Sequence, residues 1–145
     1  MIQFGWRIPD FPVEGSSAQT FVRQITETLE ALEGRFSSAW AADHFVPWAG
    51  FQDQTTETFE GWTTLTYLAG LFRTFHFGSI VLSQSYRSPA LVAKMAATLQ
   101  TLSGGRFILG LGAGGRRMST TPMATSFLPL PRAFSNWPKP PKSFA

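Results

Sequence analysis

A histidine directly after an aspartate, Asp43-His44, is the pair of side chains in this sequence best suited to proton chemistry. The pair follows an apolar run over 36–42 that predicts a strand, so it falls where that strand ends. A histidine titrates near neutral pH, so it can exchange a proton with a ligand or donate a hydrogen bond to a ring edge. The alternative is a structural histidine that closes the end of the strand layer, and these residues alone favour it.

Two further segments end in residues that let a ligand approach closely. Ser83 follows the run 75–82, which is rich in residues that favour β-strands. The loop Gly112-Ala113-Gly114 follows the apolar run 107–111. Glycine has no side chain, so backbone N–H groups in this loop can contact a ring or a phosphate. A single Gly-x-Gly is weak evidence, because the sequence lacks the third glycine, helix and acidic residue of a dinucleotide-binding fingerprint. For Ser83, a plain strand-exit turn is the alternative.

The elements that must position these residues alternate between strand and helix. Strands are predicted over 2–6, 36–42, 75–82 and 107–111, and helices over 16–33, 57–71 and 89–102. Ser16 or Ser17 can cap the first helix, and Ser88-Pro89 suits the start of the third. The apolar spacing predicts one inward face on each helix. The predicted faces are Phe21, Ile25, Leu29 and Leu32 on the first helix, Phe59, Trp62, Leu65, Leu68 and Ala69 on the second, and Leu91, Met95, Thr98 and Leu99 on the third. Such alternation implies parallel strands with right-handed crossovers, in an open sheet or in part of a barrel.

The stretch from Tyr86 to Gly114 resembles, nearly residue for residue, the third helix and fourth strand of the bacterial-luciferase-like flavin and deazaflavin oxidoreductases. That family is built on a (β/α)8 barrel of roughly 250 residues, and residues 1–114 resemble its first half. The expected fold is therefore α/β, the N-terminal half of a (β/α)8 TIM barrel with about four βα units, followed by an irregular tail.

The resemblance also implies roles for the strand-end residues. The family positions that line the flavin or deazaflavin pocket match Asp43, His44, Ser83, Gly112, Ala113 and Gly114. His44 would act in catalysis. Trp6, expected just past the first strand, would line a substrate pocket or, as the alternative, fill the end of the barrel. The region of Ser83 would carry a non-prolyl cis peptide bond. Some relatives that bind flavin mononucleotide (FMN) have Arg where this chain has Ala113, so the resemblance does not supply that contact to the phosphate. The expected cofactor is FMN or a deazaflavin coenzyme, and the sequence does not distinguish them.

Three more residues match family motifs outside the strand ends. Glu60 and Trp62 match a Glu-x-Trp motif, and Arg87 matches Tyr-Arg-x-Pro. We expect a structural partner for Glu60 and a core position for Trp62. For Arg87 we favour contact with a neighbouring helix end over contact with a ligand.

The activity that the resemblance implies is that of an oxidoreductase or monooxygenase acting on a small organic substrate. A reduced flavin would react with oxygen and then substrate, or a deazaflavin would transfer a hydride. The alternative is a non-enzymatic, truncated half-barrel, and we expect this chain by itself to be inactive. No metal is expected, because no cluster of metal ligands is evident. Open sheet edges would allow oligomers or aggregation.

Charge and composition exclude several other classes. The net charge is +3, but all nine acidic residues lie at or before Glu60 and five of the twelve basic residues follow Gly114. A nucleic-acid-binding role would rest on this basic tail alone, so no nucleic-acid partner is expected. The sequence lacks cysteine, a long apolar run and a signal-peptide start, which predicts a cytoplasmic protein without a membrane partner.

Residues 115–145 differ in composition and in apolar spacing from the preceding domain, 1–114. They hold six of the ten prolines and show no regular apolar spacing, which predicts an unstructured segment. In the reading frame offset by one base, their codons can spell Glu-Tyr-x-Ala-Tyr-Gly, which resembles the family's continuation after the fourth strand. We therefore expect 115–145 to be an out-of-frame tail.

Overall fold

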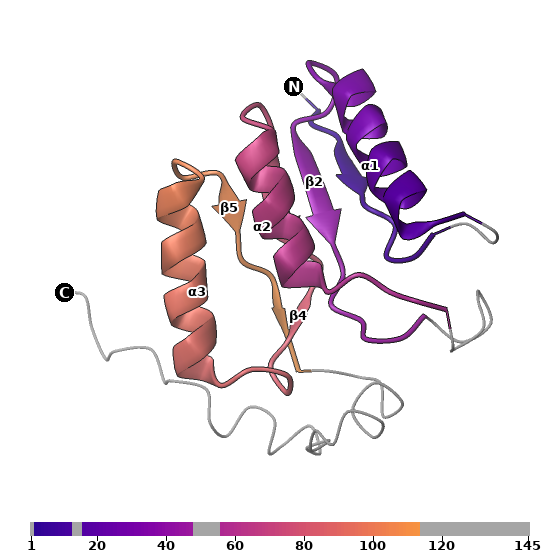
Figure 1. The fold of residues 1–145 in the computed structure, drawn as a ribbon. Coiled ribbons are helices and arrows are strands. Elements are labelled where there is room, and N and C mark those ends of the chain that lie inside the picture. The colour runs from indigo at the N-terminus through magenta and orange to yellow at the C-terminus, as the bar shows by residue number, and fades with distance from the viewer. Residues whose placement is uncertain (1, 13–15, 48–55, 114–145) are drawn as a thin grey trace.

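Strands and helices alternate through the residues that the computed structural model describes, 2–12, 16–47 and 56–113. The elements are β1 (Gly5–Arg7), α1 (Ala18–Leu32), β2 (Ser38–Ala41), α2 (Gly61–Leu71), β3 (His76–Ser79), β4 (Leu82–Ser83), α3 (Pro89–Leu102), β5 (Phe107–Ile108) and β6 (Leu111–Gly112). The three helices lie side by side along one face of the sheet (Figure 1). The predicted alternation is confirmed.

The main sheet is parallel and keeps the order of the chain, β1-β2-β3-β5. A doubly wound sheet reverses its strand order near the middle, whereas a barrel wall does not. The register pairs Trp6 with Ala39, Ala39 with Phe77 and Phe77 with Phe107. These four side chains share one face of the sheet and pack in the hydrophobic core under the helices.

Local capping explains where the helices begin. Ser17 Oγ accepts a hydrogen bond from the Thr20 N–H at 3.1 Å, and Ser88 caps α3 with Pro89 at its first position. Both predicted caps are confirmed. The second helix begins at Gly61 rather than at 57, because the Glu60 carboxylate accepts the first free N–H groups, from Trp62 and Thr63, at 3.0 and 2.7 Å.

The helix faces match the apolar spacing except on α3. The core contains Phe21, Ile25 and Leu29 of α1, Leu65, Leu68 and Ala69 of α2, and Phe75 before β3. On α3 the buried residues are Val92 and Leu99, and Leu91 is 50% exposed. The predicted α3 face was therefore wrong at Leu91 and at the exposed Thr98, because the helix is rotated toward Val92.

Two predicted strands are each interrupted. The run 75–82 forms β3 and β4, separated by a cis peptide bond between Ile80 and Val81, and the run 107–111 forms β5 and the start of β6. At the interruption the Ser79 hydroxyl accepts a hydrogen bond from the Gly110 N–H and donates one to the Gly110 carbonyl, at 2.9 Å each. The same carbonyl also accepts from the Leu82 N–H at 2.9 Å. Beyond it β4 and β6 pair with each other, and Ser83 lies opposite Gly112.

Candidate functional site

The segments predicted to carry chemistry meet at the carboxyl edge of the parallel strands. Asp43 and His44 follow β2, while Ser83 and Gly112 end β4 and β6. The Ser83 N–H donates to Asp43 Oδ2 at 2.9 Å, and the Gln84 N–H donates to the Gly112 carbonyl at 3.0 Å. The structure thus brings Asp43-His44, Ser83 and Gly112 together, although up to 69 residues separate them in the chain. Enzymes on (β/α)8 barrels use this edge of the strands for their active sites.

The Asp43 carboxylate is buried and fully engaged by protein groups. Its side chain is 1% exposed. Oδ2 accepts from the Ser83 N–H and from Arg87 Nη1 at 2.7 Å, and Oδ1 accepts from Arg87 Nη2 at 3.0 Å. The Arg87 contact is therefore bidentate, the geometry in which guanidinium and carboxylate groups pair most strongly.

Arg87 also joins this site to the start of α2. Its Nη2 forms an ion pair with Glu60 Oε1, and its side chain is 11% exposed. The Glu60 carboxylate at the same time caps α2 through Trp62 and Thr63. The expectations of a structural partner for Glu60 and of a helix-end contact for Arg87 are confirmed. The bond to Asp43 was missed, although the match of all three residues to family motifs was a signal for it.

The charges in this cluster shift the pKa values of its members. Burial raises the pKa of Glu60, but hydrogen bonds from Thr63 and Trp62 and the charge of Arg87 together lower it below its ordinary value. Burial lowers the pKa of Arg87, and the bonds and charges of Asp43 and Glu60 outweigh this and raise it. Glu60 and Arg87 therefore both carry their charges at neutral pH.

The remaining predicted site residues differ in how the structure places them. His44 is half-buried beside Asp43, and the next residue, Phe45, stacks on Tyr86 with ring centroids 4.0 Å apart. Ala113 is also half-buried, and Gly114 lies outside the described residues. Trp6 lies within β1 rather than past it and packs against the hydrophobic core, which favours a packing role over a pocket wall.

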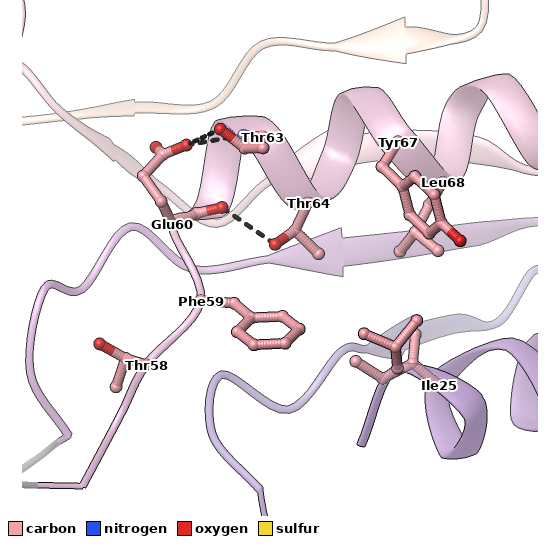
Figure 2. Close-up of a pocket in the computed structure, with 9 residues that line it drawn as sticks. Ile25, Thr58, Phe59, Glu60, Thr63, Thr64, Tyr67 and Leu68 are labelled. Carbon is pink, nitrogen blue, oxygen red and sulfur yellow. Dashed lines mark hydrogen bonds between the residues drawn. The ribbon is translucent and has the colours of Figure 1, made fainter. Parts of the chain in front are cut away.

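A separate groove of about 580 Å³ lies between α1 and α2 (Figure 2). Its lining is mostly apolar and includes Ile25, Phe59, Tyr67 and Leu68, with Glu60 at one end. Its lining comes from α1, α2 and the segment directly before α2, and includes no residue of β4 or β6. The described ranges contain no group of three or more potential metal ligands, and none of their helices is long and apolar enough to cross a membrane.

Comparison with known proteins places the chain in a family. The luciferase-like monooxygenase family matches residues 2–140. Over 95 residues the chain is 36% identical to an F420-dependent hydroxymycolic acid dehydrogenase of Mycobacterium tuberculosis, covering 65% of this chain and 26% of that enzyme. The chain thus spans about a quarter of the length of that relative.

Solved structures show the same fold. An F420-dependent secondary alcohol dehydrogenase, in complex with an F420-acetone adduct, matches 90% of this chain and 37% of its own with a TM-score of 0.70 and 21% identity. The oxygenating constituent of a type II Baeyer-Villiger monooxygenase of Pseudomonas putida, in complex with FMN, matches 83% of this chain and 32% of its own with a TM-score of 0.66 and 21% identity. The α/β fold with a parallel sheet, as one part of a barrel, is confirmed. The chain belongs to the luciferase-like monooxygenase family.

Proposed function

We propose that the described residues form the ring-facing part of a cofactor site in an F420- or FMN-dependent oxidoreductase. The observation that carries the proposal is the convergence of Asp43-His44, Ser83 and Gly112 at the carboxyl edge of the strands. The half-buried His44 can donate a hydrogen bond to a ring edge or hold a proton beside the substrate. A Cβ added at Gly112 would lie 2.5 Å from Val81 Cγ2, so this glycine makes room for the Val81 side chain beside the site. At the half-buried Ala113 the small side chain lets a planar ring approach the backbone.

The chemistry of the cofactor sets the class of reaction. A bound deazaflavin would supply hydride transfer to or from a small organic substrate, and bound FMN would supply oxygen chemistry. The F420-dependent dehydrogenases among the relatives favour the deazaflavin. The protein residues would orient the ring, exclude water and position a proton at His44. We place this activity in the cytoplasm.

We further propose that this chain alone binds the intact, phosphate-bearing cofactor weakly and does not turn over. Its described elements include the four strands of the main sheet and three helices, whereas phosphate sites on this fold follow strands 7 and 8 of a barrel. Each charge-assisted hydrogen bond to a phosphate contributes about 1.5–3 kcal/mol.

Titration with phosphate-free ring compounds tests the ring-facing site directly. We expect riboflavin and the riboflavin-like deazaflavin to shift the backbone amide resonances of residues 43–45, 83–85 and 111–113. His44→Ala should weaken binding about tenfold, a loss of roughly 1.4 kcal/mol. The matched control is His76→Ala, which removes an exposed histidine at the amino end of β3. Equal effects of the two substitutions, or shifts confined to other residues, would contradict the proposed site.

A further inference from the structure

Two loops that carry the proposed site residues are tied together by an arginine outside the ring-facing set. Arg87 lies between β4 and α3, immediately before the cap Ser88. It contacts Asp43, which directly precedes His44, and Asp43 in turn accepts the N–H of Ser83. One guanidinium group therefore fixes the loop after β2 to the loop after β4.

The same arginine connects these loops to a rigid element. Its Nη2 is shared between Asp43 Oδ1 and Glu60 Oε1, and Glu60 caps the first turn of α2. These contacts require the planar guanidinium group, because one group donates two parallel hydrogen bonds to Asp43 and a third to Glu60, each in a fixed direction. A lysine would keep the positive charge but would make these contacts from a single nitrogen.

An aromatic contact joins the same two loops at the neighbouring positions. Phe45 follows His44 and Tyr86 precedes Arg87, and their rings stack at 4.0 Å with an angle of 18° between the planes. The Phe45 carbonyl also accepts a hydrogen bond from Thr58 Oγ1 at 2.8 Å. Both sequence neighbours of His44 are therefore held by the segment after β4. Asp43 is held by the ion pair with Arg87, and Phe45 by the stack on Tyr86.

We propose that Arg87 is a positioning residue, which with Asp43 and Glu60 sets the separation between His44 and Ser83. Asp43 then contributes to the site through Arg87 and Ser83 rather than by contact with the cofactor, because its side chain is 1% exposed. That Arg87 positions residues of a cofactor site rests on the proposed function. That Arg87 fixes the loop of His44 relative to the loop of Ser83 is a property of the unliganded chain.

The experiment compares Arg87→Lys and Arg87→Met with the unchanged chain. In the unliganded chain, we expect Arg87→Lys to shift the amide resonances of 43–45 and 83–86 while those of α1 stay in place. Affinity for the ring compounds should fall about tenfold, since small displacements of a site group can reduce its effect by an order of magnitude or more. Arg87→Met should shift the same resonances and lower the ring affinity at least as much. If Arg87→Met does not fold, the result for Arg87→Lys tests the proposal.

The matched control is Arg106→Met at the opposite end of the strands. Arg106 donates to the carbonyls of Ala69, Phe72 and Phe75, so its loss should lower stability without moving the two site loops. The proposal is overturned if Arg87→Lys leaves the loop resonances unchanged, or if Arg106→Met reduces ring affinity as much at equal loss of stability. If the unchanged chain binds no ring compound, the proposed function fails, and the unliganded resonances still decide the positioning role.

Discussion

Glu60 shows how one side chain serves both a helix and a site. Its two carboxylate oxygens accept the N–H groups of Trp62 and Thr63, and one of them also faces Arg87. Negative charge is favourable at a helix N-terminus, so the cap and the ion pair both stabilise the ionised form. The lowered pKa of Glu60 follows from these bonds, against the opposing effect of burial.

Glu60→Gln tests the contribution of this charge to stability. A lowered pKa in the folded chain means that the stabilisation is present above pH 4.5, the ordinary value, and is lost as the pH falls below it. We expect the variant to lose about 1 kcal/mol of unfolding free energy at neutral pH and to show a shallower loss on acidification. Urea unfolding at a series of pH values measures both effects.

The exposed Glu57, three residues earlier, provides the matched control. Glu57→Gln should leave both the neutral-pH stability and its acid dependence close to those of the unchanged chain. An equal flattening of the pH profile in the Glu57 and Glu60 variants would contradict the assignment to Glu60.

At the scale of elements, Trp40 determines how β1, β2 and β3 pack on the face opposite the helices. Its Nε1 donates to Ser38 Oγ at 2.9 Å, and its ring extends over glycines on both neighbouring strands. A Cβ added at Gly5 would lie 2.6 Å from Trp40 Nε1, and one added at Gly78 would lie 2.5 Å from Trp40 Cε3. These two glycines therefore supply the space for the indole.

Gly78→Ala should destabilise the chain by overpacking this contact. We expect a loss of about 1–3 kcal/mol in unfolding free energy. In a Trp40→Leu background the same glycine substitution should have a smaller effect, because a shorter side chain leaves room for the added methyl group. A double-mutant cycle in urea measures the coupling, and strictly additive effects would show that Trp40 does not impose the glycine.

At the scale of the whole molecule, the described residues form a wall with helices on one face only. Within these residues β1 and β5 each pair with one neighbouring strand of the main sheet. Ile80, Val81, Ile108 and Leu109 are exposed apolar residues on or beside its strands. Unpaired parallel edges and exposed apolar patches favour association with another chain.

We therefore predict that this chain self-associates as its concentration rises. Ile108→Lys should shift the association to higher concentration, because it places a charge on the edge strand β5. Sedimentation measurements over a concentration series check this. Leu102→Lys is the control, since Leu102 is an equally apolar and more exposed residue at the end of α3. A monomer at all concentrations, or equal effects of both lysines, would contradict the prediction.

The reading frame that encodes residues 115–145 also bears on the whole molecule. These residues lie outside the described ranges. The family match extends to residue 140, past the point where the shift is predicted, which argues against a shift. The offset frame argues for it, because its codons can spell Glu-Tyr-x-Ala-Tyr-Gly, and we predict that the coding DNA contains an open frame, offset by one base after codon 114. Long-read sequencing of the locus checks this, and stop codons throughout that frame would contradict it.

The sequence by itself determined the caps of α1 and α3, two of the three helix faces and the parallel order of the strands. Caps and apolar spacing act over three or four residues, so Ser17 and Ser88 could be identified without the fold. Alternation of strands and helices then requires parallel strands. The predicted residues Asp43-His44, Ser83 and Gly112 could be named because each follows an apolar run.

Only the tertiary structure decided which side chains meet. The interruption at Ser79 depends on Gly110, 31 residues later, and the bidentate contact joins Asp43 to Arg87 across 44 residues. Such contacts follow from where strands and helices pack, and local spacing carries no information about partners that far apart. For the same physical reason the sequence could propose Asp43 for a cofactor, whereas its buried contacts with Arg87 and Ser83 appear only in the folded chain.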